Sequence, residues 1–307
     1  MYDVIGDIHG YADELEELLK KIGYSRGSGG YRHPERQAVF LGDFIDRGPL
    51  QKGVINIVRP MIETGAALSV MGNHEFNAIA YFTPANDFGY LRKRNDRTTK
   101  QHAAFLREFE NDRTAWTDVI EWFKSLPLWL ELDEIRIIHA CWDPKLILKI
   151  KEHQSGSALV GDDLLHKAME PGTWQGMAIE TLLKGKEIPL PNGVSFPDKE
   201  GTIRNHIRVR WWDNAKTFRG AYLGPENALT HIPKETISGD HVIDYRHDEK
   251  PVFLGHYWFT GRPKPLAPNI ACVDYSVAKS GGKLVAYRWN GERVLVADNF
   301  VWVDRIT

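Results

Sequence analysis

The chain has 307 residues, of which 42% are hydrophobic and 26% are charged, and its formal net charge is −2. These values are ordinary for a globular protein with a full core, and the small charge argues against a surface that coats nucleic acid, so no stable nucleic-acid partner is predicted. Two cysteines are too few for a disulfide framework and no apolar run reaches membrane-spanning length, which favours a cytoplasmic location and excludes a membrane partner.

Strand and helix patterns alternate in the N-terminal part of the chain. Short apolar runs predict buried strands, and apolar residues repeated at helical spacing predict helices between them. The expected strands cover residues 2–5, 38–41 and 67–70, and the expected helices cover residues 13–22 and 54–64. This order is typical of a parallel βαβ arrangement. The glycine-rich segment 25–30 lacks the lysine and the hydroxyl residue of a phosphate-binding loop, so we expect a plain connector there.

Two insertions and a run of strands make up the rest of the chain. Residues 81–124 are polar, aromatic and helix-like, whereas residues 143–249 show an irregular, partly helical pattern. Further strands are expected at 128–132, 135–139, 252–256, 270–273, 284–289, 293–297 and 300–303. Turn signals between the last of these favour antiparallel pairing. We therefore predict a two-sheet α/β sandwich with helices outside, in a single domain 1–307 whose insertions form a largely helical cap.

Polar residues of metal-binding type follow five of the predicted strands. They are Asp7, His9, Asp43, Asn73, His139 and His256. Taken singly, an aspartate after a strand is usually a helix N-cap, and a histidine there is usually a hydrogen-bonded core residue. Six such residues together are better explained by convergence on the edge of the sheet where ligands bind. Carboxylate, imidazole and carboxamide groups suit Mn²⁺, Fe or Zn²⁺, and six ligands suit two ions that share Asp43.

Five sequence blocks resemble, in order, the signature blocks of the calcineurin-like metallophosphoesterases. The blocks are Gly6-Asp7-Ile8-His9-Gly10, Gly42-Asp43-Phe44-Ile45-Asp46-Arg47-Gly48, Gly72-Asn73-His74-Glu75, Ile138-His139-Ala140 and Gly255-His256. They are most similar to the branch that holds the Ser/Thr protein phosphatases, the bacterial diadenosine tetraphosphate hydrolases and the phosphatase module of bacterial polynucleotide kinase-phosphatases. The strands after residue 270 are also similar to that branch, whereas the two insertions carry no resemblance.

The resemblance implies a metal centre with two divalent ions, with manganese expected first and iron or zinc as alternatives. Asp7 and His9 would hold the first ion, and Asp43 would bridge the pair. The second ion would be held by Asn73, His139 and His256. A hydroxide that bridges the ions would attack the phosphate in line and without a phosphoenzyme, because two cations lower the pKa of bound water.

Three further residues are implied to take part in catalysis. His74 would donate a proton to the leaving oxygen, a step typically worth about 10²–10⁴-fold in rate. Asp46 would orient the ring of His74 and keep it charged, as carboxylates do for other catalytic histidines. Arg47 would offer its planar guanidinium to two phosphoryl oxygens.

Two departures from the family pattern bear on the substrate. Relatives outside this branch often end the last block Gly-His-x-His, whereas Trp258 stands at that position here, so the first ion should have fewer protein ligands. The eukaryotic protein phosphatases carry an arginine where Met71 stands, which weakens the case for a phosphoprotein substrate. A large tryptophan-bearing cap favours a small phosphorylated or nucleotide-like substrate over a protein.

Some residues near the blocks have two readings. Arg208 or Arg210 is expected to bind phosphate, and an ordinary surface salt bridge is an equally weighted alternative for either residue. Trp142 and Trp258 flank ligand positions and would shape the pocket, although packing of the insertion onto the sheet is the more usual role for such rings. The histidines outside the blocks, His102 among them, have polar sequence neighbours and receive no role.

The first predicted function is hydrolysis of phosphate monoesters. A diadenosine-polyphosphate hydrolase or phosphodiesterase is the second, and a non-catalytic scaffold of the same fold is the remote alternative. A scaffold should have replaced Asp43, Asn73 or His74, and all three are present.

Overall fold

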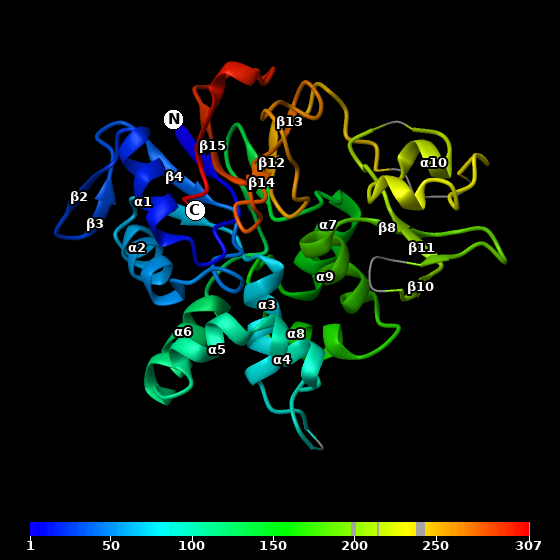
Figure 1. The fold of residues 1–307 in the computed structure, drawn as a ribbon, viewed down its shortest axis with the longest axis horizontal. Coiled ribbons are helices and arrows are strands. Elements are labelled where there is room, and N and C mark those ends of the chain that lie inside the picture. Colours follow the sequence, from blue (N-terminus) through cyan, green and yellow to red (C-terminus); the bar gives the residue numbers. More distant parts are fainter. Residues whose placement is uncertain (87, 198–200, 214, 238–242, 307) are drawn as a thin grey trace.

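The computed structural model describes residues 1–86, 88–197, 201–213, 215–237 and 243–306 (Figure 1). Two β-sheets form its centre, helices lie outside them, and the later part of the second insertion extends to one side of the molecule. The predicted two-sheet α/β sandwich is confirmed, and the sheets place the polar strand ends described below.

The first sheet has six strands, in the order β14-β15-β1-β4-β5 with β16 paired to β15. The strands are β1 (Tyr2–Ile5), β4 (Gln37–Phe40), β5 (Ala67–Ser69), β14 (Asp274–Tyr275), β15 (Lys283–Trp289) and β16 (Phe300–Asp304). β4 runs parallel to both β1 and β5, with Phe40 opposite Ile5 and Ser69. β15 is antiparallel to β1, β14 and β16. The predicted antiparallel pairing at the end of the chain is confirmed for β14, β15 and β16, but it is wrong for the strand expected at 270–273, which pairs parallel to the strand Val252–Leu254 in the second sheet.

The second sheet has four strands in the order β13-β12-β7-β6. They are β6 (Trp129–Glu131), β7 (Arg136–Ile138), β12 (Val252–Leu254) and β13 (Ile270–Cys272). The chain passes from this sheet to the first at Val273, between β13 and β14. Val4 and Val39 of the first sheet share a buried cluster with Ile137 and Phe253 of the second. The inner faces of the two sheets thus form one apolar layer, as in other face-to-face sandwiches.

Two helices cover the outer face of the first sheet. α1 (Ala12–Lys21) buries Leu15, Leu18 and Leu19, and α2 (Gln51–Glu63) buries Val54 and Val58, all within the main core. These residues recur at the three- and four-residue spacing of one helix face, which is why the segments fold as helices against the sheet. Among the described residues, no helix is both long and apolar enough to cross a membrane.

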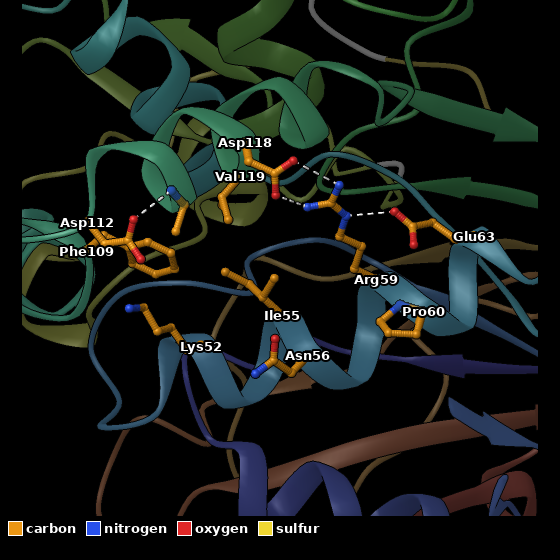
Figure 2. A pocket seen from close by; sticks show the side chains of 11 residues that line it. Lys52, Ile55, Asn56, Arg59, Pro60, Glu63, Phe109, Asp112, Asp118 and Val119 are labelled. Carbon is orange, nitrogen blue, oxygen red and sulfur yellow. Dashed lines mark hydrogen bonds and ion pairs between the residues drawn. The ribbon is translucent and has the colours of Figure 1, made fainter. Parts of the chain in front are cut away.

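The first insertion is helical, as predicted. α3 (Asn73–Phe82) leads into it, and its helices are α4 (Asp96–Gln101), α5 (Ala103–Phe109) and α6 (Arg113–Lys124). A cavity of about 340 Å³ lies between α2 and α6, and Figure 2 shows Arg59 on its wall, paired with Glu63 and Asp118. None of the described residues that line this cavity is a predicted metal ligand. The cavity therefore belongs to the packing of the insertion on α2.

The second insertion has two parts. α7 (Pro144–His153), α8 (Asp162–Met169) and α9 (Trp174–Lys184) pack into the main core. The later part consists of β8 (Glu187–Pro189) paired with β11 (His206–Arg208), β9 (Phe196–Pro197) paired with β10 (Ile203–Arg204), α10 (Phe218–Ala221) and the 3-10 helix η1 (Glu226–Ala228). Positions 198–200, 214 and 238–242 lie outside the described residues.

The expectation of a largely helical cap is wrong for this later part. Ile188 of β8 pairs opposite Ile207 of β11, and both belong to a small buried cluster that is separate from the main core. Short two-stranded ladders bring such isolated apolar residues together, whereas the irregular spacing of the segment offers no continuous apolar face for a helix.

Two local expectations also fail. Segment 25–30 is not a plain connector, because β2 (Ser25–Gly27) and β3 (Gly30–Arg32) form a hairpin. The expected strand at 293–297 is a loop that leads into the 3-10 helix η2 (Ala297–Asn299). In that loop the backbone N–H of Leu295 donates to Pro268 at 2.7 Å, so this N–H is satisfied without a neighbouring strand.

Candidate metal centre

The chain turns sharply where strands of both sheets end. His9, Asp43 and His256 follow β1, β4 and β12, and each has a left-handed backbone, with φ values of 50°, 51° and 70°. Asp46 and Arg47, in the loop after Asp43, are left-handed as well. Such conformations cost about 1–3 kcal/mol each in residues with a Cβ, and they persist where the surroundings impose them. The turns direct side chains from separate strands to one edge of the sandwich.

Asp43 lies at the centre of this edge. Its Oδ1 accepts a hydrogen bond from the backbone N–H of His74 at 2.9 Å. Its Oδ2 is buried and has no hydrogen-bond partner among the described residues. That oxygen lies 3.6 Å from Nε2 of His9 and 3.5 Å from Nε2 of His139. A buried anionic oxygen that faces two imidazoles without a hydrogen bond has the environment of a metal ligand.

The potential ligand atoms form two groups that share Asp43. The groups are His9, Asp43 and His74 on one side, and Asp43, His139 and His256 on the other. Within each group the ligand atoms lie within 4.8 Å of one another. Asn73 adds its Oδ1 to the second group, 3.2 Å from Nε2 of His139 and 2.8 Å from Nδ1 of His256. One carboxylate between two groups is the arrangement expected for two ions with a common ligand.

Backbone carbonyls orient two of the histidines. Nδ1 of His9 donates to the carbonyl oxygen of Ile45 at 3.0 Å, and Nδ1 of His139 donates to that of Leu41 at 2.7 Å. A carbonyl only accepts, so each ring carries a proton on Nδ1, and Nε2 is the atom directed toward Asp43. Nε2 of His9 is buried and has no partner among the described residues. Both rings are oriented to bind a cation through Nε2.

Asp7 lies beside the two groups rather than within either of them. Its carboxylate accepts the backbone N–H of His256 at 3.1 Å. Gly255 permits this approach, because a Cβ at that position would lie 2.2 Å from Oδ1 of Asp7. Burial and the charge of Asp274 raise the pKa of Asp7 well above its usual value. A nearby cation would favour the ionised form of this carboxyl group.

Burial and neighbouring charges shift the pKa values of several groups at the centre. Burial and the charge of Asp43 raise the pKa of Glu75 to about 7. Burial lowers the pKa of His139, but the carboxylates of Asp43 and Asp7 outweigh it and raise that pKa to about 10. Burial, with the charges of Arg47 and Arg208 acting in the same direction, lowers the pKa of His9 and His256 well below its usual value, so these two rings favour the neutral form in which imidazole binds metal ions. The buried Oδ2 of Asp43 and Nε2 of His9, which have no partner among the described residues, are of the donor types that divalent cations bind.

Glu75 supports the centre in a way that the sequence analysis did not anticipate. Its Oε2 accepts the backbone N–H of Asp43 at 2.7 Å and that of Gly72 at 3.0 Å, and its Oε1 accepts that of Phe44 at 2.9 Å. The side chain thereby ties the Asp43 turn to the start of α3. A signal was present in the sequence, because a glutamate three residues after a helix cap is half of a capping box.

The three predicted catalytic residues lie together next to Asp43. Nδ1 of His74 is 2.6 Å from Oδ2 of Asp46, and Nε2 of His74 is 3.3 Å from Nη2 of Arg47. The guanidinium carbon of Arg47 lies 4.0 Å from the centroid of the Trp258 ring. His74 is therefore held between the carboxylate of Asp46 and the guanidinium of Arg47, which in turn packs on the ring of Trp258.

His102 also contacts this group, which the sequence analysis missed. Its Nδ1 lies 2.9 Å from Oδ2 of Asp46, the oxygen that His74 also contacts. Burial raises the pKa of Asp46, but the hydrogen bonds from His102 and His74 outweigh it and lower that pKa to about 2. The contact joins positions 56 residues apart, and the polar residues before His102 gave no indication that its ring is buried.

The two candidate arginines have different surroundings. Nη1 of Arg208 lies 3.3 Å from Nε2 of His256, which places this guanidinium at the centre, and its Nη2 also forms the alternative salt bridge, with Glu187 at 3.4 Å. The guanidinium of Arg210 instead donates to the backbone of Gly220 and pairs with Asp213 at 3.4 Å. Of the two expectations for Arg210, the salt bridge describes its position in the fold.

The two candidate tryptophans also differ. The ring of Trp258 is 39% exposed and borders the site through Arg47. Trp142 is only 2% exposed, and the guanidinium of Arg136 lies 5.1 Å from its ring centroid. A ring that is packed in the core presents no surface to a substrate, so Trp142 has the packing role that was its alternative reading.

Comparisons with known proteins agree with this geometry. The profile of the family described as calcineurin-like phosphoesterase matches residues 2–256. Bis(5'-nucleosyl)-tetraphosphatase PrpE (asymmetrical) of Oceanobacillus iheyensis is 36% identical over 164 residues, which cover 52% of this chain and 64% of that protein. Bis(5'-nucleosyl)-tetraphosphatase (symmetrical) of Vibrio parahaemolyticus is 26% identical over 313 residues, which cover 96% of this chain and 97% of that protein. The chain thus spans less than two thirds of the Oceanobacillus relative.

A solved structure shows the same fold. A protein serine/threonine phosphatase of Saccharomyces cerevisiae superposes with a TM-score of 0.52 at 15% identity, covering 100% of this chain and 80% of that one. The family match extends over most of the chain and includes all five blocks that end at the metal edge. The chain belongs to the calcineurin-like phosphoesterase family.

Proposed function

We propose that the protein hydrolyses phosphate esters at a dinuclear metal centre, in one catalytic domain with cap insertions at 81–124 and 143–249. The observation that carries the proposal is the position of Asp43 in two groups of potential ligands. Asp7 and His9 are assigned to the first ion, with Asp43 as the bridge. The second ion is assigned to Asn73, His139 and His256.

The ions supply the nucleophile and the charge, and the chain supplies orientation. When bound, two divalent ions lower the pKa of a water molecule and polarise phosphoryl oxygens. Oxygen and imidazole donors suit Mn²⁺ first, with Fe and Zn²⁺ as alternatives. Arg47 and Arg208 approach His74 and His256, respectively, at 3.3 Å. Their guanidinium groups are the proposed contacts for phosphoryl oxygens.

His74 is assigned to protonation of the leaving group rather than to a metal. Its Nε2 is 4.0 Å from Oδ2 of Asp43, but its Nδ1 is bonded to Asp46 and its Nε2 faces Arg47. A guanidinium only donates, so Nε2 accepts in this arrangement. When a phosphoryl group engages Arg47, Nε2 is released, can take up a proton from solvent, and can then donate this proton to the departing oxygen. Trp258 supports Arg47 through a cation–π contact.

The names of the relatives favour a dinucleoside polyphosphate as the substrate. Both relatives described above are bis(5'-nucleosyl)-tetraphosphatases. The partly exposed ring of Trp258 lies beside Arg47, and Nζ of Lys279 is 4.7 Å from its centroid, so a nucleobase that stacks on this ring next to the phosphate contact would take the place of the lysine ammonium. We therefore rank hydrolysis of dinucleoside polyphosphates, the second function predicted from the sequence, above hydrolysis of phosphate monoesters.

A phosphate monoester remains the second candidate because of the His74–Asp46 pair. The nucleotide that leaves a dinucleoside polyphosphate departs as a stabilised anion and needs little protonation. An alcohol that leaves a monoester needs a proton, and the pair held at 2.6 Å is suited to supply it.

A substrate panel separates these candidates. With Mn²⁺ present, we expect diadenosine tetraphosphate to have a higher kcat/KM than para-nitrophenyl phosphate or bis-para-nitrophenyl phosphate. Chromatography of the products would show whether cleavage yields ADP alone or AMP with ATP. A higher kcat/KM for the monoester would reverse the order of the two candidates. No turnover of any of the three by protein with bound ions would favour the scaffold reading.

A glycine substitution tests the placement of Asp7. We expect Gly255→Ala to weaken metal binding by roughly 10–100-fold, because the added Cβ displaces the carboxylate of Asp7. Gly27→Ala is the matched control, since a Cβ there meets only a backbone oxygen at 3.8 Å. Titration with Mn²⁺, followed by electron paramagnetic resonance of the free ion, measures both variants. Equal affinities would contradict the assignment of Asp7 to an ion.

A further inference from the structure

Asp46 is contacted by two buried histidines rather than one. Nδ1 of His74 and Nδ1 of His102 lie 2.6 Å and 2.9 Å from the same oxygen, Oδ2. His102 is 1% exposed and Asp46 is 0% exposed, so water does not compete for this contact. The other oxygen, Oδ1 of Asp46, is buried and has no hydrogen-bond partner among the described residues. The carboxylate is thus held through one oxygen from two directions.

Arg92 fixes the hydrogen-bond direction of His102. Its Nη1 lies 2.8 Å from Nε2 of His102. A guanidinium is only a donor, so Nε2 of His102 accepts and Nδ1 carries the proton toward Asp46. Arg92 is itself held, because its guanidinium also donates to Gln101 and its backbone N–H donates to Ala80 at 2.9 Å. The hydrogen bonds from Arg92 through His102 and from His74 on the other side therefore converge on the carboxylate of Asp46.

The first insertion also holds the far end of the Asp46 loop. The carboxylate of Glu108 in α5 accepts the backbone N–H groups of Gln51 at 2.6 Å and Lys52 at 2.8 Å, at the start of α2. The side chain of Gln51 accepts the backbone N–H of Asp46 at 2.6 Å and donates to Gly48 at 2.6 Å. The segment that carries His102 thus contacts this loop at two places, through His102 at Asp46 and through Glu108 at the start of α2.

We infer that His102, backed by Arg92, is a positioning residue that holds the carboxylate of Asp46 in the orientation required by His74. With a donor from His74 alone, the carboxylate could turn about its Cβ–Cγ bond and present either oxygen. A second donor on Oδ2 from another direction leaves one orientation, and so fixes the ring of His74 relative to the leaving group. The inference deepens the proposed function and rests on its assignment of His74.

A purely structural role for His102 predicts a different outcome. Its ring also packs against that of Tyr81, with centroids 5.3 Å apart, so its loss would disturb packing. Loss of packing would lower the rate for every substrate alike, or lower stability alone. Loss of positioning would act mainly on reactions in which the leaving group needs a proton.

Two variants and two substrates separate these roles. For His102→Leu, we expect kcat on an alkyl phosphate to fall about 10-fold or more, and kcat on para-nitrophenyl phosphate to change less than about 3-fold. For His102→Asn, whose amide nitrogen can take the place of Nδ1, we expect both rates within about 3-fold of the wild type. Metal content and the unfolding midpoint are measured for each variant. Equal losses on both substrates, or no rescue by asparagine, would overturn the inference.

If the wild-type protein hydrolyses neither monoester, a spectroscopic measurement can still test the role of His102. Protein labelled with ¹⁵N-histidine and loaded with Zn²⁺ should show downfield Nδ1–H resonances for His74 and His102, both bonded to a carboxylate. In His102→Leu the His74 signal should broaden or shift, and in His102→Asn it should stay. An unchanged His74 signal in His102→Leu would refute positioning. Absence of monoester turnover in the wild type would instead remove the monoesterase candidate. Failure of the positioning inference can therefore be distinguished from failure of the proposed monoesterase function.

If His102→Leu does not fold, Arg92→Met provides the same test from outside the contact. That variant leaves the ring of His102 in place and removes the donor to its Nε2, so its Nδ1 is no longer obliged to face Asp46 as a donor. We expect the same preferential loss on the alkyl phosphate, at smaller size. A loss that is equal for both substrates would again overturn the inference.

Discussion

Replacing His74 by asparagine is expected to lower kcat on an alkyl phosphate by about 10²-fold or more, while both ions stay bound. The imidazole is the proposed proton donor to the leaving oxygen, and its Nδ1 is held 2.6 Å from Asp46. Its backbone N–H, which bonds Oδ1 of Asp43 at 2.9 Å, is unaffected by the change. Steady-state kinetics together with metal analysis of the same preparation measure the two quantities.

The control for this variant is His231→Asn, at an exposed histidine far from the five blocks in sequence, which should behave as the wild type. On para-nitrophenyl phosphate the loss should be smaller, since a nitrophenolate leaves with little protonation. A near-normal rate of His74→Asn on the alkyl phosphate would remove the general-acid assignment. Loss of one ion along with activity would instead place His74 among the metal ligands.

Asp43→Asn should empty the centre. The asparagine side chain can still accept the backbone N–H of His74, so the turn is preserved, but the negative charge between His9 and His139 is lost. We expect fewer than one ion per chain after Mn²⁺ loading, against about two for the wild type. The loss of metal affinity should be larger than the roughly 10–100-fold loss that follows when a residue hydrogen-bonded to a metal ligand is removed. Activity should fall with occupancy.

Asp46→Asn is the matched comparison for this variant. It makes the same chemical change three positions later in the loop, in a residue assigned to His74 rather than to an ion. Its ion content should equal that of the wild type, whereas its rate on an alkyl phosphate should fall. If Asp43→Asn bound two ions, the assignment of Asp43 as the ligand shared by both ions would be wrong. If Asp46→Asn lost an ion, the division of roles within the loop would be wrong.

The amino-acid sequence by itself determined the fold class and the sheet edge at which the candidate metal ligands lie. Each strand that leads to Asp7, Asp43, Asn73 or His139 is a short apolar run that stops at a polar residue, and such patterns are local. The ends of neighbouring strands in a sheet meet at one edge, so the local pattern also implies convergence. The signature blocks added the family, and the family profile confirmed it. The cluster around Asp43 could therefore be anticipated without coordinates.

The tertiary structure alone decided which residues outside the blocks reach the site. His102 contacts Asp46 across 56 positions, while the residues before it are polar and indicate a solvated helix. Arg208 and Arg210 are two positions apart and look alike in sequence, yet only Arg208 approaches His256. Trp142 follows the His139 block closely and is nevertheless buried.

The physical reason is the range of the interactions concerned. Hydrophobic periodicity and turn residues act over a few positions, so they can be read along the chain. The surroundings of His102 depend on how α4 and α5 pack against the loop after Asp43, and the packing of an insertion is the sum of many weak contacts between distant segments. The sequence thus specified the edge that carries the candidate ligands, and the docking of the first insertion placed the second histidine, His102, on Asp46.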